Sequence, residues 1–264
     1  MHIIRTTALI VVALVIGACS HAPAEPEPGS DLAIFWVKHA AEFRALSLQA
    51  YGSAERHLDE FIADTSWSAL PGQHDAAHLP PAVILDVDET VVSNVDFQKV
   101  LVPPFAPSKL DTWYRENEAF EIPGVSSFVA KAQAAGVEVF FVTNRPCEPD
   151  GQSPCTQRQT TLKSLAEIGI ETDAEHVLLA RERGWNREKV SRRQHVAENY
   201  RVIMLFGDDL GDFIPCVRKK PYAPCTEPAT PESRKAATEA HKGYWGHGWY
   251  ILPNPMHGSF TAWD

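Results

Sequence analysis

The chain has 264 residues, of which 44% are hydrophobic and 22% charged, and its 34 acidic residues against 24 Lys and Arg give a net charge of −10. This length suits one large α/β domain or two small ones, and the composition excludes a largely disordered protein. The acidic balance argues against a nucleic acid polymer as a partner.

The first 18 residues are typical of a secretory signal peptide. Their apolar stretch, 8–16, is shorter than the roughly 20 residues of a permanent membrane helix, and small residues precede Cys19. We therefore expect cleavage before Cys19 and lipidation of its thiol, as in bacterial lipoproteins. The alternative is an ordinary signal with Cys19 incidental. The expected protein is exported and lipid-anchored, in the outer membrane facing the periplasm because Ser20 rather than Asp follows Cys19.

A tether over 19–31 is expected to lead into a single domain over 32–264. Apolar residues three or four apart predict a helix over 31–64. Beyond it, short apolar runs predict strands at 82–85, 137–142, 177–180, 202–206 and 249–252, with helices between them at 125–135, 157–168 and 187–198. This alternation indicates an α/β fold with a parallel sheet flanked by helices. The polar, aromatic stretch 91–122 predicts a small, mostly helical cap, and 226–242 a surface excursion with some helix.

Three predicted strands are followed by polar residues at the edge where open α/β sheets bind ligands. They are Asp-Val-Asp-Glu-Thr at 86–90, Thr-Asn-Arg at 143–145 and Gly-Asp-Asp-Leu-Gly-Asp-Phe at 207–213. Carboxylates that converge there repel one another unless a cation is present, and oxygen ligands suit Mg²⁺. The expected contributors are Asp86, Asp88, Asp208 and Asp212, the last through water or by orienting a Lys. Asp209 is expected to face solvent or to cap the next turn.

Asp86 is the candidate nucleophile, placed to attack phosphorus and form an aspartyl-phosphate. Asp88 is the candidate acid and base, since two nearby carboxylates raise the pKa of one of them. The Thr143 hydroxyl and the Asn144 backbone N–H are candidates to hold phosphoryl oxygens, and Lys189 to neutralise their charge. Each residue also has an alternative interpretation without a catalytic role: the aspartates can cap a turn, the threonine can end a strand and the lysine can lie on a solvated helix face.

The five cysteines fit an exported protein. Lipid on Cys19 leaves four, as two close pairs with seven and eight intervening residues. Four cysteines allow three pairings, and short loops favour Cys147 with Cys155 and Cys216 with Cys225. A zinc site is the rival reading, but zinc ligands usually lie two to four residues apart.

The ordered motifs resemble those of the haloacid dehalogenase (HAD) superfamily. Acids at both ends of the fourth motif match its four-aspartate phosphatases, and the chain is most similar to the class C acid phosphatases, the bacterial outer-membrane lipoprotein type. Further matches are the leading helix around 36–51, Pro123-Gly124 and the closing segment 252–256. The departures are Asp209, where the family usually has Asn, and His257, where it usually has Tyr.

This resemblance implies a Rossmann-like core and a Mg²⁺-dependent phosphomonoesterase acting at acid pH on nucleoside 5′-monophosphates and aryl phosphates. By motif match, Asp86 is nucleophile and metal ligand, Asp88 is acid and base with its backbone carbonyl on the metal, and Asp208 is the third protein contact. A homodimer is a further expectation.

Substrate recognition is expected from Trp113, Tyr114 and His257, because relatives place an aromatic near Trp113 beside the leaving group. The alternative is that Trp113 anchors the cap by packing. Two other functions stay open at this point: phosphate transfer to an alcohol through the same intermediate, and a surface binding lipoprotein with a vestigial phosphatase core.

Overall fold

The computed structural model describes residues 28–147 and 155–263. The predicted signal peptide, Cys19 and the tether up to residue 27 lie outside these ranges. Helix α1 begins at Pro28, so the last residues assigned to the tether, 28–31, are helical instead. None of the helices in the described ranges has the length and apolar character needed to cross a bilayer.

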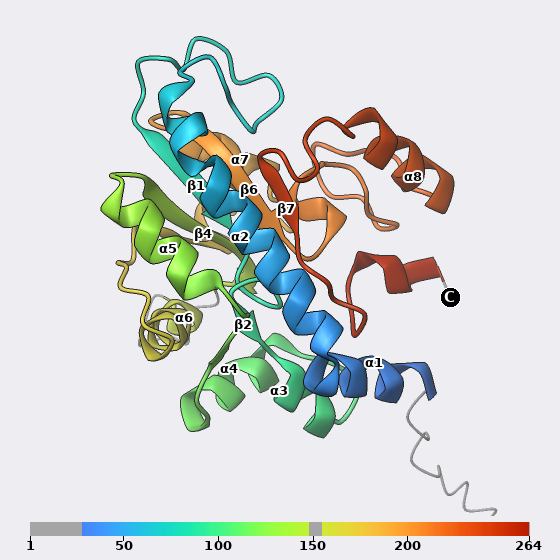
Figure 1. Cartoon of the computed structure of the whole chain (residues 1–264). Coiled ribbons are helices and arrows are strands. Elements are labelled where there is room, and N and C mark those ends of the chain that lie inside the picture. The colour runs from blue at the N-terminus through green and yellow to red at the C-terminus, as the bar shows by residue number, and fades with distance from the viewer. Residues whose placement is uncertain (1–27, 148–154, 264) are drawn as a thin grey trace, which may run out of the picture.

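A five-stranded parallel sheet in the order β5-β4-β1-β6-β7 forms the centre of the domain (Figure 1). Its strands are β1 (Pro81–Leu85), β4 (Glu138–Pro146), β5 (Val177–Ala180), β6 (Arg201–Gly207) and β7 (Trp249–Ile251). The sheet confirms the α/β class and every predicted strand. β4 continues to Pro146 rather than ending at Val142, so Thr143 and Asn144 lie within the strand.

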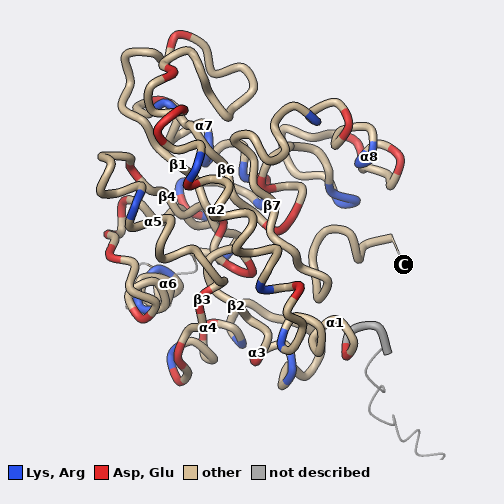
Figure 2. Tube along the Cα trace, in the orientation of Figure 1, with Lys and Arg blue, Asp and Glu red and all other residues tan. Residues whose placement is uncertain are grey.

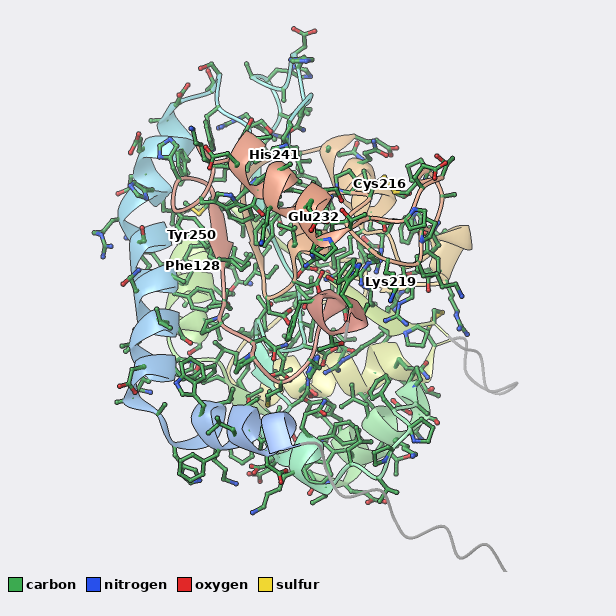
Figure 3. The ribbon with its side chains drawn as sticks, turned by 90° about the vertical axis from the view of Figure 1, so that its right-hand side faces the viewer. Phe128, Cys216, Lys219, Glu232, His241 and Tyr250 are labelled. Atoms are coloured by element: carbon green, nitrogen blue, oxygen red, sulfur yellow. A yellow bond between two sulfur atoms is a disulfide. The ribbon has the colours of Figure 1, made fainter. Side chains whose placement is uncertain are left out.

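Helices cover both faces of the sheet, and buried residues of β1 alternate between them. Val83 and Leu85 pack in the layer that includes α2 and α5, whereas Ala82 and Ile84 pack on the side of α7. Phe128 and Tyr250 belong to the first layer, beside α2 (Figure 3). Burial on both faces explains why these strands read as continuous apolar runs. The helices are α1 (Pro28–His39), α2 (Ala41–Ala63), α3 (Val95–Val100), α4 (Pro107–Glu116), α5 (Val125–Ala134), α6 (Thr156–Glu167), α7 (Val190–Ala197) and α8 (Pro231–Ala240), with short 3-10 helices η1 (Glu182–Gly184), η2 (Leu210–Asp212) and η3 (Ser259–Trp263).

The predicted single helix over 31–64 is divided into α1 and α2 at Ala40, whose backbone is extended with φ −77° and ψ 128°. The prediction of one continuous helix was therefore wrong. α1 turns away from the sheet and packs against α3, where Lys38 pairs with Asp96. α2 ends beside Arg201, whose guanidinium donates to the Phe61 and Asp64 carbonyls at 2.9 Å each and so occupies acceptors that the helix end leaves open.

The stretch 91–122 is mostly helical, as predicted, and contributes α3 and α4. These two helices lie with α1 at one end of the sheet (Figure 1). A two-stranded antiparallel ribbon of β2 (Val92–Ser93) and β3 (Phe120–Glu121), which the sequence pattern does not signal, joins the two ends of this stretch. The outer helices α4, α6 and α8 carry charges of both signs (Figure 2).

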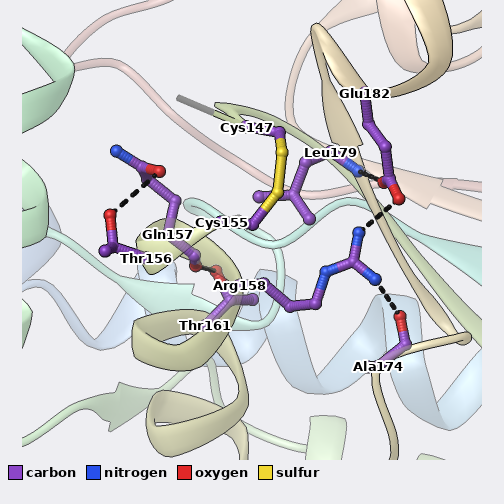
Figure 4. The surroundings of a disulfide bond; sticks show 9 residues. All are labelled: Cys147, Cys155, Thr156, Gln157, Arg158, Thr161, Ala174, Leu179 and Glu182. Carbon is purple, nitrogen blue, oxygen red and sulfur yellow. Dashed lines mark hydrogen bonds and ion pairs between the residues drawn. A yellow bond between two sulfur atoms is a disulfide. The ribbon is translucent and has the colours of Figure 1, made fainter. Parts of the chain in front are cut away.

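Both predicted disulfides are present: Cys147 with Cys155 and Cys216 with Cys225. The first links the end of β4 to the start of α6, in whose first turn Arg158 pairs with Glu182 at 2.5 Å and donates to the Ala174 carbonyl at 2.6 Å (Figure 4). The second closes the loop that follows η2. Each bridge therefore secures a loop just beyond a strand that bears a motif.

Candidate active site

The central strand β1 delivers Asp86 to the carboxyl edge of the sheet. The Asp86 backbone N–H donates to the Phe206 carbonyl of β6 at 3.0 Å, which continues the parallel ladder one residue past β1. β6 ends at Gly207 and leads directly into Asp208. As a result, carboxylate oxygens of Asp86, Asp208 and Asp212 lie within 4.8 Å of one another.

Lys189 joins this carboxylate cluster from the start of α7. Its side chain is 3% exposed, and its Nζ contacts Asp86 Oδ1 and lies 2.6 Å from Asp212 Oδ1. Burial acts to lower the pKa of Lys189, but Asp212 and Asp86 outweigh it and leave the pKa above its usual value. The lysine is therefore a permanent cation that also fixes the direction of both carboxylates.

One ammonium does not balance three carboxylates this close together, and the pKa values of Asp86 and Asp208 show this. Burial, together with Asp212 and Asp88, raises the pKa of Asp86 to about 6 even though Lys189 opposes the shift. Burial also raises the pKa of Asp208 well above its usual range, with Asp86 and Asp212 adding to the effect. Oxygen donors with a surplus of negative charge fit a hard divalent cation.

The chain reverses direction immediately after Asp88. Glu89 adopts φ +63°, in the left-handed region that L-residues enter at a cost, and its N–H donates to the Val92 carbonyl at 2.8 Å. The Asp88 side chain does not join the three-carboxylate cluster. It accepts from Asn94 Nδ2 at 3.0 Å and pairs with Arg145 Nη2 at 2.7 Å.

Arg145 decides the protonation of Asp88. Burial works to raise the pKa of Asp88, but the charge and hydrogen bonds of Arg145 outweigh it and lower that pKa below its usual value. The pKa raised by carboxylate proximity therefore belongs to Asp86 and not to the candidate acid Asp88, because Asp88 has its own guanidinium partner. Arg145 also lies over the Tyr114 ring, 4.5 Å from its centroid.

The second motif is held by an arginine from α7. Arg192 is fully buried; it donates to the Thr143 carbonyl and, through Nη2, to Asn144 Oδ1 at 2.7 Å. The Thr143 hydroxyl oxygen accepts from the Arg145 N–H at 3.1 Å, and Thr143 itself is fully buried. Asn144 lines the adjacent pocket, whereas Thr143 is not among its lining residues.

The fourth motif forms a tight turn that depends on Gly207. Asp209 caps η2 by accepting from Gly211 N–H at 2.8 Å, while its own N–H donates to Asp212 Oδ2 at 2.9 Å. This is the capping role expected of Asp209. A Cβ on Gly207 would lie 2.3 Å from Asp212 Cβ, so only glycine lets Asp212 come this close to the strand end.

The chain matches the family model described as HAD superfamily, subfamily IIIB (acid phosphatase), over residues 36–260. It belongs to this acid phosphatase subfamily. The chain is also similar to the class C acid phosphatase from Bacillus anthracis, with 28% identity, a TM-score of 0.68, and coverage of 87% of this chain and 85% of that one. A second structure of the Bacillus anthracis enzyme, with tungstate bound, matches with a TM-score of 0.70 at the same identity and coverage.

As a class C HAD acid phosphatase, the protein is a phosphoric monoester hydrolase that acts on small-molecule phosphates. HAD phosphatases generally use a divalent metal, and the cluster of Asp86, Asp208 and Asp212 has the donor atoms for one. The family match and the two similar structures confirm the resemblance seen in the sequence.

The acid phosphatase has a pocket of about 420 Å³ over the carboxylate cluster. Tyr114 and His257, both expected near the substrate from the sequence, line it. Trp113 does not: its ring packs 6.0 Å from that of Phe97, in the role of cap anchor that was the alternative reading. The neighbouring Phe105 lines the pocket instead.

His257, which replaces the family's usual tyrosine, is tied to the first motif. Its Nε2 lies 3.2 Å from Oε1 of Glu89, which is 2% exposed. Burial acts to lower the pKa of His257, but the hydrogen bond and charge of Glu89 outweigh it and raise the pKa above its usual value. The position therefore carries a cationic ring in acidic solution.

Three residues of this site were not predicted from the sequence. Arg145 and Arg192 hold the first and second motifs, and Asn254 Nδ2 donates to Asp208 Oδ2 at 2.7 Å. Arg145 directly follows Thr143-Asn144, and Asn254 lies in the matched closing segment. Both residues therefore belong to motifs found in the sequence, but no role was predicted for either. Neither side chain's partner can be read from the sequence.

Proposed function

We propose that the protein is a Mg²⁺-dependent acid phosphatase that hydrolyses nucleoside 5′-monophosphates and aryl phosphates through an aspartyl-phosphate on Asp86. The observation that carries this proposal is the position of Asp86: it contacts the Lys189 ammonium, lies beside two further carboxylates and lines the pocket. Asp86 is only 7% exposed and lines the pocket, so the pocket gives a substrate access to its carboxylate.

The metal would be held by Asp86 and Asp208, with Asp212 beside them and bound to Lys189. When bound, Mg²⁺ neutralises carboxylate charge and draws charge from the phosphoryl oxygens. Asn254 orients Asp208, because its amide donates to one of the two carboxylate oxygens. The other Asp208 oxygen accepts at most a long bond, 3.5 Å from the Thr90 hydroxyl.

In the first step, a carboxylate oxygen of Asp86 attacks phosphorus, the bond from phosphorus to the leaving oxygen breaks, and Asp88 gives that oxygen a proton. In the second, water attacks the phosphoaspartate, Asp88 takes the water's proton, and phosphate leaves with Asp86 restored. Asp88 suits both steps because Arg145 and Asn94 fix its carboxyl group at the pocket wall.

The pocket supports the proposed preference for nucleotides and aryl phosphates. Its wall on the side of α3 and α4 includes Leu101, Phe105 and Leu110. Apolar and aromatic side chains at that wall can cover a flat leaving group, which a small alkyl phosphate does not offer.

Asp86→Asn tests the chemistry. Turnover should be abolished while the fold survives, and wild-type protein quenched with acid during turnover of labelled substrate should carry label that the variant lacks. Asp59→Asn is the matched control, because Asp59 is exposed on α2. A variant that keeps a tenth of the wild-type rate would overturn the assignment, and full activity in excess EDTA would overturn the metal.

We also propose that the protein is exported and anchored by lipid on Cys19, in the outer membrane facing the periplasm. Support comes from the N-terminal sequence and from the two disulfides, which persist in oxidising compartments. Cys19→Ser should release the protein from membranes; unchanged partitioning would reject the anchor.

A further inference from the structure

Four arginine and lysine side chains line the pocket, and two of them have no strong partner. Arg145 is paired with Asp88 at 2.7 Å, and Lys189 with Asp86 and Asp212. The remaining cations are Arg187 and Arg218. Their charge is not needed by the catalytic carboxylates, which already have Lys189 and the expected metal.

Arg218 is held in place without satisfying its donors. Its side chain is 15% exposed, and its nearest acidic oxygens lie 3.7 Å away on Asp209 and 3.9 Å away on Glu188, beyond hydrogen-bond distance. Its Nε is buried without a hydrogen-bond partner. Asp209 is already engaged, since it accepts from Gly211 N–H and from Ser259. Arg218 therefore lines the pocket with a charge that its acidic neighbours compensate only at long range.

Arg187 is exposed and lines the same pocket, and within the described residues its side chain makes no ion pair or hydrogen bond. The two arginines belong to one wall. Glu188, the neighbour of Arg187, accepts from the Cys216 N–H at 3.4 Å, and the Cys216–Cys225 loop carries Arg218. Figure 3 labels Cys216 and Lys219 on this loop; Lys219 is not free, because it donates to the Ala262 carbonyl at 2.6 Å.

We propose that Arg187 and Arg218 form a subsite for a second phosphate group on the substrate, so that the enzyme prefers organic bisphosphates to the corresponding monophosphates. The proposal rests on the proposed function, since it concerns a substrate whose first phosphate meets Asp86. Guanidinium groups match phosphate in geometry and bind it through paired N–H donors. The apolar wall at Phe105 would cover the organic part that joins the two phosphates.

The test compares adenosine 3′,5′-bisphosphate with adenosine 5′-monophosphate on the full chain. We expect kcat/KM for the first phosphate released to favour the bisphosphate by about tenfold, as for a charge-assisted contact, and less at about 0.5 M salt. In Arg187→Gln and Arg218→Gln the ratio should fall close to one. Arg218→Lys, which keeps the charge beside Asp209 and Glu188, should give an intermediate ratio. Arg44→Gln, at an exposed site on α2, should leave it unchanged.

Binding of both nucleotides to Asp86→Asn by calorimetry repeats the comparison without turnover. A wild-type ratio near one, or a ratio that both arginine variants leave intact, overturns the subsite. Failure of the proposed function has a different signature, because wild-type protein would then release phosphate from neither compound or Asp86→Asn would release it as fast.

Discussion

Arg145 Nη2 lies 2.7 Å from Oδ1 of Asp88, and Arg145 Nε lies 3.1 Å from Oδ2, so both oxygens of the candidate acid are held by one guanidinium that is itself buried. The contact joins β4 to the turn after β1. It lowers the pKa of Asp88, which means that the carboxyl group is protonated only in more acidic solution than an unpaired aspartate.

The pH profile of Arg145→Gln follows from this sign. Without the guanidinium, the pKa of Asp88 should rise, so more of the acid is protonated at any given pH. The alkaline limb of kcat/KM should move to higher pH by about one unit or more. Arg145→Lys should move it less, and Arg44→Gln not at all. A fall in rate at every pH with the limb in place would mean that Arg145 only supports the fold.

The contact from Asn254 to Asp208 predicts a metal phenotype. Asn254→Ala removes the donor that orients Asp208, so the Mg²⁺ concentration for half-maximal activity should rise about tenfold or more, with activity restored at high Mg²⁺. Asn199→Ala, at an exposed site after α7, is the control. If Mg²⁺ titrations of the two variants superimpose, Asn254 does not orient a metal ligand.

Gly207→Ala tests the close approach of Asp212 to the end of β6. The new Cβ would lie 2.3 Å from Asp212 Cβ, so either the strand end or the fourth motif must shift. We expect a loss of stability of about 1–3 kcal/mol and a large loss of activity. Gly243→Ala is the matched control, because no atom lies within 4 Å of its added Cβ. Equal melting temperatures and equal activities for the two variants would contradict this account.

Trp113 and Phe105 separate packing from recognition. Trp113→Ala should lower the melting temperature, because the ring packs against Phe97, with little change in substrate preference. Phe105 is 51% exposed and lines the pocket, so Phe105→Ala should lower kcat/KM for a nucleoside 5′-monophosphate relative to glycerol phosphate by about fivefold. The reverse pattern would restore Trp113 as the contact to the leaving group.

The strands and the positions of the motifs could be predicted because strand burial and motif position follow from local patterns. The buried strands of a parallel sheet can be recognised in the sequence as apolar runs, and each motif begins where such a run ends. The break at Ala40 could not be predicted, since no glycine or proline marks it. The helix before the break, α1, packs on α3, which is a contact between segments far apart in the sequence.

Side-chain partners were harder to predict than side-chain positions. The sequence places Asp88 and Arg145 at neighbouring strand ends, but their pairing depends on the reversal at Glu89, a left-handed residue without a glycine to signal it. Whether Trp113 or Tyr114 faces the pocket likewise depends on the rotation of α4, and two adjacent aromatic residues on a short helix leave that rotation open.

The order β5-β4-β1-β6-β7 sets the three motif strands side by side at the middle of the sheet, whereas the residues proposed to contact the leaving group come from segments outside it. Phosphate chemistry and substrate choice are therefore encoded in separate parts of the chain. A lineage can replace the cap helices or the Cys216–Cys225 loop and acquire a new substrate without altering any group that touches phosphorus. The same division makes those two segments the places to graft in order to redirect the enzyme.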